Sequence, residues 1–239
     1  MRRVEWFAVD WGNSNLRIWC MDEHSNVVDS LFSSKGMLSL TPDQYVPTLI
    51  ELLAPYLDAS RQMPVLACGA IGSRQGLEEV PYRPIPCRPI EGAHTVSVSD
   101  KRISVEIVPG LSQNTPEGVM RGEESQIAGV LLHSGLDSQV ICLPGTHSKW
   151  AKVRKGTVSE FRSAMTGELF HVLSTHSILR FSVESESFDL SSFDAGVALA
   201  KQSPETLTSE LFTLRSQDLL NATSSSVLRS RLSGLLIGV

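Results

Sequence analysis

Long hydrophobic runs, closely spaced cysteine pairs and an excess of positive charge are all absent from this sequence. No apolar run approaches the roughly 20 residues that a membrane-spanning helix needs. Asp10 and Gly12 come too early in the chain to leave room for the apolar core of a signal peptide. The four cysteines lack CxxC spacing, which favours reduced thiols. We therefore expect a cytoplasmic protein with no membrane partner.

Basic residues are too few to create a field that attracts nucleic acid. Lysine and arginine number 21 against 26 aspartates and glutamates, so the formal net charge is -5. Non-specific binding to nucleic acid depends on an excess of positive charge. We therefore expect no nucleic-acid partner, and an anionic ligand must be held by local cations and backbone amides.

A turn rich in polar groups lies near the start of the chain, between two strand-like segments. Residues 9–19 read VDWGNSNLRIW, with Asp10 before the turn, Gly12, Asn13 and Ser14 within it, and Arg17 after it. Most hairpin turns need only a glycine or an asparagine to reverse the chain. The extra carboxylate, hydroxyl and guanidinium groups indicate a binding role. The alternative is an ordinary Asn-containing turn in which Asp10 caps neighbouring amides.

The order of elements around this turn recurs later in the chain. Periodicity predicts three strands and a helix at 4–10, 15–21, 27–32 and 41–60. The same order is predicted at 139–145, 148–153, 157–164 and 167–179. A second polar turn, with Gly145 and Thr146 in it and Lys149 directly after it, joins the first two strands of the later set. The recurrence indicates duplicated subdomains.

The segments outside the two sets are simpler. Short buried strands are predicted at 64–70 and 103–110, with a proline-rich irregular stretch at 71–102 between them. An amphipathic helix is predicted over 118–135, with acidic residues in its first turn. Residues 186–239 read as three helices, around 191–202, 205–220 and 225–237.

Several motifs occur together in an order that resembles one family. The stretches are FAVDWGNSNLRIW, GAIGS, PGL, VMRGEESQIAG, LPGTHSKW, FRSAMTGELFHVL and LSGLLIG. Together they resemble the 2-dehydro-3-deoxygalactonokinase family of the sugar kinase/hsp70/actin superfamily. The resemblance implies an α/β fold of two duplicated ribonuclease H-like (actin-like ATPase) lobes with a central cleft. We expect an N-terminal lobe at 1–113 and a C-terminal lobe at 114–239. Family members continue with a segment that lines the adenine pocket, so the resemblance implies a truncated, incomplete second lobe.

The resemblance also implies an activity. Members of this family use ATP and Mg2+ to phosphorylate the terminal (6-) hydroxyl of 2-dehydro-3-deoxy-D-galactonate in galactonate catabolism. A small sugar acid is then the expected partner, and a homodimer is one alternative for the oligomeric state. The activity of a chain that lacks the adenine-pocket segment stays open at this point.

Phosphate handling is the role that the resemblance implies for the two polar turns. Backbone N–H groups can close around phosphate oxygens where glycine lets the backbone approach. Asp10 is expected to hold Mg2+ through water. The alternative for the second turn is a tight turn with an exposed Lys149, and His147 is given no proton-transfer role. The predicted nucleotide-binding residues are Gly12, Asn13, Ser14, Arg17, Gly145, Thr146 and Lys149.

The expected base is a carboxylate in RGEESQIAG. Glu123 falls closest to the aspartate of the GDxxA motif in related kinases, and we predict that it accepts the proton of the attacking hydroxyl. Arg121 is predicted to stabilise developing phosphoryl charge or to bind the substrate carboxylate. Glu124 is predicted at the substrate. The alternative is that acids in a first helical turn only complement the helix dipole, and that Arg121 is a solvated surface residue.

Two further segments are candidates for the sugar acid. GAIGSRQG resembles the sugar-facing loop of the family, with Gly72 and Ser73 matching and Arg74 as a partner for a carboxylate. The family has an aromatic residue where this chain has Leu77, which leaves the exact sugar acid open. Thr166 and Glu168 match a second segment at the metal or acceptor side. The alternative for that segment is a plain helix N-terminus with a threonine cap.

Two rival functions remain. Type III pantothenate kinases share the D-x-G-N-S/T opening, although MRGEE, PGTHSKW and MTGEL argue against that assignment. A non-catalytic sugar-acid or nucleotide-binding protein of the same fold is the other alternative.

Overall fold

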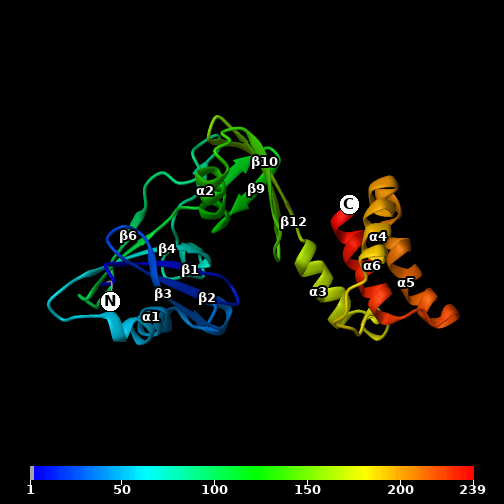
Figure 1. Ribbon diagram of the computed structural model, residues 1–239, viewed down its shortest axis with the longest axis horizontal. Coiled ribbons are helices and arrows are strands. Elements are labelled where there is room, and N and C mark those ends of the chain that lie inside the picture. Colours follow the sequence, from blue (N-terminus) through cyan, green and yellow to red (C-terminus); the bar gives the residue numbers. More distant parts are fainter. Residues whose placement is uncertain (1–2) are drawn as a thin grey trace. The chain divides into compact units, whose positions relative to one another are not determined.

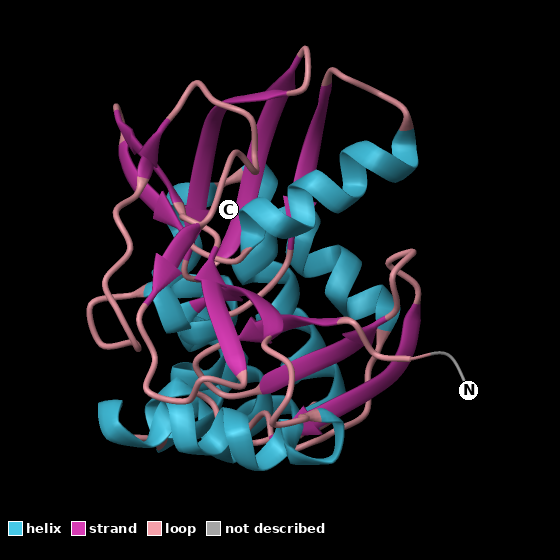
Figure 2. Ribbon diagram, turned by 90° about the vertical axis from the view of Figure 1, so that its left-hand side faces the viewer, coloured by secondary structure: helices cyan, strands magenta, loops and turns pink. Residues whose placement is uncertain are grey.

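A computed structural model describes residues 3–239 as a mixed α/β protein (Figure 2). The chain divides into two compact units (Figure 1). The first unit comprises Met1–Cys142 and Lys149–Arg162, and the second comprises Leu143–Ser148 and Ser163–Val239. This division does not follow the expected boundary between residues 113 and 114, and the two predicted lobes and their duplication stay predictions.

A six-stranded sheet organises the first unit, in the order β3-β2-β1-β4-β7-β6. The first three strands pair antiparallel as two hairpins, and β4 and β7 continue the sheet parallel to β1. This confirms the three strands predicted at the start of the chain. The bounds are β1 Trp6–Trp11, β2 Leu16–Met21, β3 Val27–Ser33, β4 Met63–Gly69, β7 Ile103–Ile107 and β6 His94–Val96.

The core of the first unit explains why these residues form strands. Alternate residues of β1 are buried, namely Phe7, Val9 and Trp11. They pack in one cluster with Leu49 and Leu53 of helix α1 (Tyr45–Leu53). Alternation of this kind is the pattern of a strand with one face on a core. Each large side chain contributes about 1.5–3 kcal/mol by burial.

The predicted helix over 41–60 is present but is divided. Short 3-10 turns η2 (Pro42–Gln44) and η3 (Ala54–Tyr56) flank the α-helix α1 (Tyr45–Leu53). Pro47 lies in the first turn of α1, where a helix tolerates a missing N–H, whereas Pro55 lies in η3 after α1 has ended.

The expectation of an irregular stretch over 71–102 is only partly right. The 3-10 turn η4 (Ala70–Gly72) opens it, and two short strands lie within it, β5 (Arg83–Pro84) and β6. Strand β6 pairs antiparallel with β7, and β5 pairs parallel with β8 (Leu111–Asn114). Proline and glycine density marked the loops here but could not reveal strands whose partners lie far away in the sequence.

The helix predicted over 118–135 begins later than expected. Strands β8 (Leu111–Asn114) and β9 (Glu117–Met120) form a hairpin, and helix α2 runs from Glu123 to Ser134. Gly122 has a φ of 108°, a left-handed conformation that cannot lie inside an α-helix. Residues 118–122 therefore belong to the strand and turn that precede the helix.

The later set of elements confirms the predicted order. Strands β10 (Gln139–Leu143), β11 (Ser148–Arg154) and β12 (Thr157–Ala164) form a three-stranded sheet in that order, and helix α3 (Thr166–His176) follows. Lys155 and Gly156, with φ of 52° and 70°, make the turn between β11 and β12. Two consecutive left-handed residues are typical of a two-residue hairpin turn.

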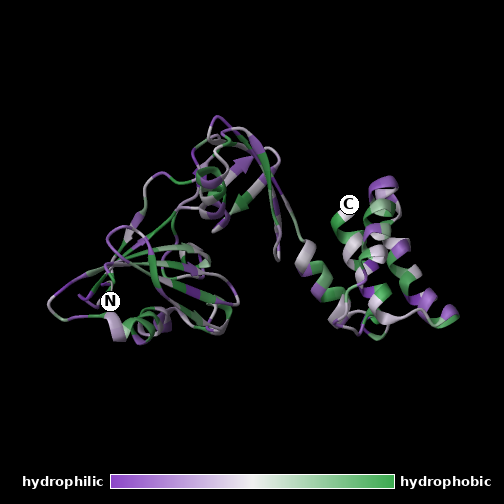
Figure 3. Ribbon diagram, in the orientation of Figure 1, coloured by the Kyte–Doolittle hydropathy of each residue, from purple (hydrophilic) through white to green (hydrophobic). Residues whose placement is uncertain are grey.

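Helices dominate the second unit, and the three predicted at its end are confirmed. They are α4 (Leu190–Gln202), α5 (Leu207–Asn221) and α6 (Ser225–Gly238). Figure 3 shows that hydrophobic and hydrophilic residues are mixed along these helices. Leu214, Leu228 and Leu232 belong to a buried apolar cluster of this unit. Gly196 and Gly234 let α4 and α6 approach closely, because a Cβ on Gly234 would lie 2.1 Å from the Phe193 carbonyl oxygen.

Candidate active site

The first polar turn is held by backbone hydrogen bonds and leaves its side chains exposed. The Gly12 N–H donates to the Asn15 carbonyl over 2.9 Å and closes the turn. The carbonyls of Gly12 and Asn13 accept from Met37 and Leu38, each over 3.0 Å. Asn13 and Ser14 are exposed. The predicted phosphate-binding groups thus lie on a turn that a following segment fixes in place.

Gly36 supports this turn, a role that was not predicted from the sequence. A Cβ at this position would lie 2.2 Å from the Ser14 carbonyl carbon and 2.3 Å from the Asn13 carbonyl oxygen. The turn therefore rests directly on the backbone of residue 36, and any side chain larger than hydrogen would displace it. The signal was a glycine soon after the third strand, but only the folded chain brings it under the first turn.

Asp10 and Arg17 face each other across the first hairpin. They are register partners on β1 and β2, and the Arg17 Nη1 lies 3.1 Å from the Asp10 Oδ2. Both side chains keep exposed surface. Arg17, predicted as a cation for phosphate, is thus in contact with the predicted magnesium carboxylate.

The carboxyl ends of β1 and β4 lie next to the start of α2. Asp10 is the register partner of Cys68 on the parallel strand β4. Gly69 and Gly122 make the close approach, because a Cβ on Gly122 would lie 3.2 Å from the Gly69 Cα. Burial raises the pKa of Cys68 to about 12, the Asp10 charge adds to the rise, and a hydrogen bond to Ser125 opposes it. The strand that carries Asp10 and the helix that begins with Glu123 therefore meet around one half-buried thiol.

Glu123 begins α2, and both of its carboxylate oxygens have protein partners. The Lys149 Nζ lies 2.9 Å from the Glu123 Oε1. The backbone N–H of Arg121 donates to the Glu123 Oε2 over 3.0 Å. The Glu123 side chain is 22% exposed and the Lys149 side chain only 5%. The orientation of the predicted base is thus fixed, and its carboxylate retains some exposed surface. The alternative in which Lys149 is exposed is wrong.

Glu124, the next residue, is fully buried. Its two oxygens each accept the Gly122 N–H over 2.8 Å. Desolvation raises the pKa of Glu124 to about 7, and hydrogen bonds to the carboxylate only partly oppose the rise. The contact with substrate that we predict for Glu124 is not available to a side chain with no exposed surface. Its place favours a role in holding the turn at Gly122 instead.

Glu124→Gln is expected to remove a loss of stability that the wild-type protein undergoes as pH rises. The raised pKa means that the folded state retains a proton that the unfolded state releases, so this stability is complete below about pH 4.5 and is lost as pH rises to about 7. Relative to wild type, the variant should gain on the order of 3 kcal/mol of unfolding free energy across that range. Denaturant unfolding at several pH values measures the difference. A difference that stays constant with pH contradicts the assignment.

Arg121 is packed in the first unit rather than solvated. Its Nη2 donates to the Val80 carbonyl over 2.6 Å, and its guanidinium lies 4.1 Å from the Tyr82 ring centroid. A Cβ on Gly72 would lie 2.9 Å from the Arg121 Nη1. Within residues 3–239, the buried Nε and Nη1 of Arg121 have no hydrogen-bond partner. The structure therefore brings together Arg121 and Gly72, and the alternative of a solvated surface arginine is wrong.

The rest of the predicted sugar-facing loop is more open. The Arg74 side chain is 79% exposed, and its Nε lies 3.4 Å from the Glu79 Oε1. Ser73 donates its backbone N–H to the Ala70 carbonyl over 2.9 Å as η4 ends. Arg74 thus lies on the surface, paired with an acid, whereas Gly72, two residues earlier in the chain, is buried.

The second polar turn lies on the first turn of helix α3, within the second unit. Gly145, Thr146 and His147 are exposed, and the Glu168 N–H donates to the Thr146 carbonyl over 3.0 Å. His147 Nε2 is hydrogen-bonded to the Glu168 carboxylate. A Cβ on Gly167 would lie 2.6 Å from the Gly145 carbonyl oxygen, so Gly167 supports this turn as Gly36 supports the first.

Thr166 begins α3 without capping it. The cap residue is Met165, and no side-chain hydrogen bond caps the helix. The alternative of a threonine cap is therefore wrong. The predicted meeting of the two polar turns across a shared cleft stays a prediction.

Comparison with known proteins decides the family. The model of the 2-keto-3-deoxy-galactonokinase family matches residues 10–239. The chain belongs to this family. The resemblance drawn from the motifs is thereby confirmed, and the match argues against the pantothenate kinase alternative.

Named relatives of the 2-keto-3-deoxy-galactonokinase family agree. A Rhizobium meliloti (strain 1021) protein named as a probable 2-dehydro-3-deoxygalactonokinase is 36% identical over 97% of this chain and 78% of its own length. The Escherichia coli (strain K12) 2-dehydro-3-deoxygalactonokinase is 32% identical over 98% of this chain and 78% of its own length. A crystal structure assigned to the same kind of protein from Sinorhizobium meliloti has 35% identity and a TM-score of 0.89, and the match covers 98% of this chain and 79% of that one.

A magnesium site in this member of the 2-keto-3-deoxy-galactonokinase family would depend on few protein ligands. No group of three or more His, Cys, Asp or Glu side chains in the described part of the chain is arranged to hold a metal ion. Mg2+ in kinases keeps several waters and binds through one or two carboxylates plus phosphates, so a single exposed carboxylate such as Asp10 fits it.

None of the helices in residues 3–239 is long and apolar enough to cross a membrane.

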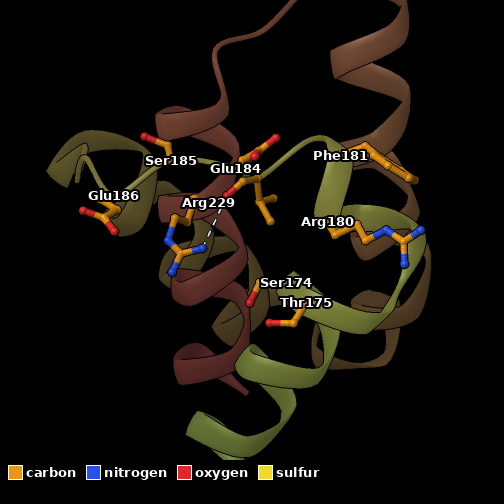
Figure 4. A pocket seen from close by; sticks show the side chains of 9 residues that line it. Ser174, Thr175, Arg180, Phe181, Glu184, Ser185, Glu186 and Arg229 are labelled. Atoms are coloured by element: carbon orange, nitrogen blue, oxygen red, sulfur yellow. Dashed lines mark hydrogen bonds between the residues drawn. The ribbon is translucent and has the colours of Figure 1, made fainter.

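A cavity of about 580 Å³ lies in the second unit, and none of the predicted site residues lines it (Figure 4). Arg229 reaches into it from α6, and its Nη1 donates to the Val183 carbonyl over 3.3 Å. Ser174 and Glu184 also line the cavity. Acidic and basic side chains both border it, so its charge does not single out one class of ligand.

Proposed function

We propose that this chain catalyses the ATP-dependent phosphorylation of the terminal (6-) hydroxyl of 2-dehydro-3-deoxy-D-galactonate. Membership of the 2-keto-3-deoxy-galactonokinase family supports the reaction. The structural observation that carries the proposal is the arrangement of Glu123 at the start of α2. Its carboxylate is partly exposed and is held by the Lys149 ammonium and the Arg121 backbone N–H. Phosphoryl transfer consists mostly of positioning and charge neutralisation, and this arrangement supplies a positioned base.

Glu123 is the proposed general base. Each of its oxygens has one protein partner and a second lone pair, so the carboxylate can still accept a hydrogen bond from the attacking hydroxyl. Accepting that proton makes the sugar hydroxyl a better nucleophile. Its place beside the carboxyl ends of the parallel strands β1 and β4 agrees with where α/β proteins bind ligands.

The phosphates are proposed to bind at the two polar turns. Asn13 and Ser14 in the first turn, and Gly145 and Thr146 in the second, are exposed and lie on turns backed by glycine. Asp10 is the proposed magnesium carboxylate, with Arg17 beside it to orient its side chain. Mg2+ bound with ATP would supply neutralisation of charge on the phosphate oxygens. The two turns are proposed to belong to duplicated lobes of the actin-like ATPase class.

Arg121 is the proposed partner for the carboxylate of the sugar acid, in preference to Arg74. Its guanidinium lies against Gly72 and retains two buried nitrogens without protein partners in the described residues. Buried donors of this kind are costly unless an acceptor satisfies them, and a carboxylate oxygen is a strong acceptor. Arg74 is mostly exposed and already faces Glu79, so solvent would weaken its contribution.

A substrate panel tests the proposed function. The purified full chain is given ATP and Mg2+ with 2-dehydro-3-deoxygalactonate, its gluconate epimer or pantothenate, and ADP release is measured. We expect turnover with the galactonate. Turnover only with pantothenate contradicts the proposal. If none is consumed while a sugar acid raises the melting temperature, the chain is a binding protein of the same fold.

A further inference from the structure

Lys149 occupies a place that does not suit the role of a phosphate ligand. It lies in the first unit on β11, directly after the second polar turn in the sequence, yet its side chain is only 5% exposed. Its Nζ lies 2.9 Å from the Glu123 Oε1. A nucleotide phosphate would have to compete with this carboxylate for the ammonium and would need access to a nearly buried atom. The contact with Glu123 is therefore the stronger guide to its function.

Lys149 and the Arg121 amide hold opposite oxygens of the same carboxylate. The ammonium contacts Oε1, and the Arg121 N–H donates to Oε2 over 3.0 Å. A glutamate in the first turn of a helix otherwise samples several side-chain rotamers. Because both oxygens are engaged, the plane of the Glu123 carboxylate is fixed relative to β11 and to the turn before α2.

We infer that Lys149 is a positioning residue for Glu123 and does not bind the nucleotide phosphates. This inference rests on the proposed function, in which Glu123 accepts the proton of the sugar hydroxyl. It assigns Lys149 to the acceptor side of the reaction, although its sequence position beside the second polar turn predicts the nucleotide side. Misplacing a reacting group by about 1 Å can cost on the order of 100-fold in rate.

Lys149→Met tests the inference, with Lys152→Met on the same strand as the matched control. We expect kcat for the sugar acid to fall on the order of 100-fold. The KM for ATP and the affinity for a nonhydrolysable ATP analogue should change less than about twofold, because no phosphate contact is lost. The control should leave all three unchanged. A tenfold or larger loss of analogue affinity with kcat retained overturns the inference.

A double-mutant cycle separates positioning from an independent contribution. If Lys149 acts only through Glu123, then Glu123→Gln and the double variant Glu123→Gln/Lys149→Met should have the same residual kcat. A further loss on adding Lys149→Met contradicts the inference. Lys149→Arg, which retains the cation, should recover part of the activity, and thermal unfolding of each variant reveals any that fail to fold.

The titration with the ATP analogue also distinguishes failure of the inference from failure of the proposed function. If wild-type protein consumes no ATP with any sugar acid, the proposed function fails. The affinity of Lys149→Met for the analogue still tests the inference in that case. Weaker binding would place Lys149 at the phosphates and overturn the inference.

Discussion

Replacing Glu123 by glutamine lowers kcat for the sugar acid by a factor on the order of 1,000, while a nonhydrolysable ATP analogue still binds. Glutamine has nearly the size of glutamate but cannot accept a proton at neutral pH, so the hydroxyl loses its base. The Arg121 amide can still donate to the remaining carbonyl oxygen, which keeps the side chain close to its present place. Steady-state kinetics and calorimetric titration with the analogue measure the two effects.

The ion pair with Lys149 requires two controls for this variant. Glu123→Gln leaves a nearly buried ammonium without its carboxylate, which lowers stability. Thermal unfolding identifies this effect, and the double variant with Lys149→Met removes the unpaired charge. Glu117→Gln makes the same chemical change on an exposed residue of β9 and should leave kcat unchanged. Full activity in Glu123→Gln would exclude Glu123 as the base.

Gly36→Ala is expected to weaken ATP binding although Gly36 itself is not a proposed phosphate ligand. The new methyl would lie 2.2 Å from the Ser14 carbonyl carbon, and backbone atoms cannot move aside as a flexible side chain can. The first polar turn must therefore shift, which should raise the KM for ATP at least tenfold and lower the unfolding free energy by about 1–3 kcal/mol. Kinetics at varied ATP concentration and denaturant unfolding measure both.

Gly129→Ala is the matched control for Gly36→Ala. A Cβ at Gly129 meets nothing within 4 Å, and the residue lies inside helix α2. Alanine is favoured over glycine in a helix, so this variant should gain up to about 1 kcal/mol and keep its affinity for ATP. If Gly36→Ala loses stability but retains normal nucleotide affinity, the first turn is not part of the nucleotide site.

Local pattern predicted much of the fold because strands and helices leave a periodic record in the sequence. The alternation of Phe7, Val9 and Trp11 indicated a half-buried strand, and each of these residues is buried. The helix expected to start near Gly118 was wrong because its apparent apolar period continued backward through β9. Met120 is buried in a strand pairing with Leu111, a contact that helical spacing cannot distinguish from a helix face.

The candidate site, like the fold, was only partly predictable from the sequence. The residue types of the two polar turns and of MRGEE can be read directly from the sequence, because chemistry depends on which side chains are present. Which of them touch is not recorded there. Glu124 is next to Glu123 in the chain, yet one is fully buried and the other partly exposed, because consecutive helical residues point in different directions.

By itself, the sequence determined the mixed α/β class, the two polar turns and the family, since these depend on residue identity and local spacing. Only the tertiary structure decided that Lys149 contacts Glu123, that Gly36 and Gly167 support the turns, and that Arg121 lies against Gly72. Each of these is a contact between segments far apart in the chain or on different elements. Such contacts arise from the close packing of side chains in the folded chain. The distances between packed atoms cannot be read from the order of the residues.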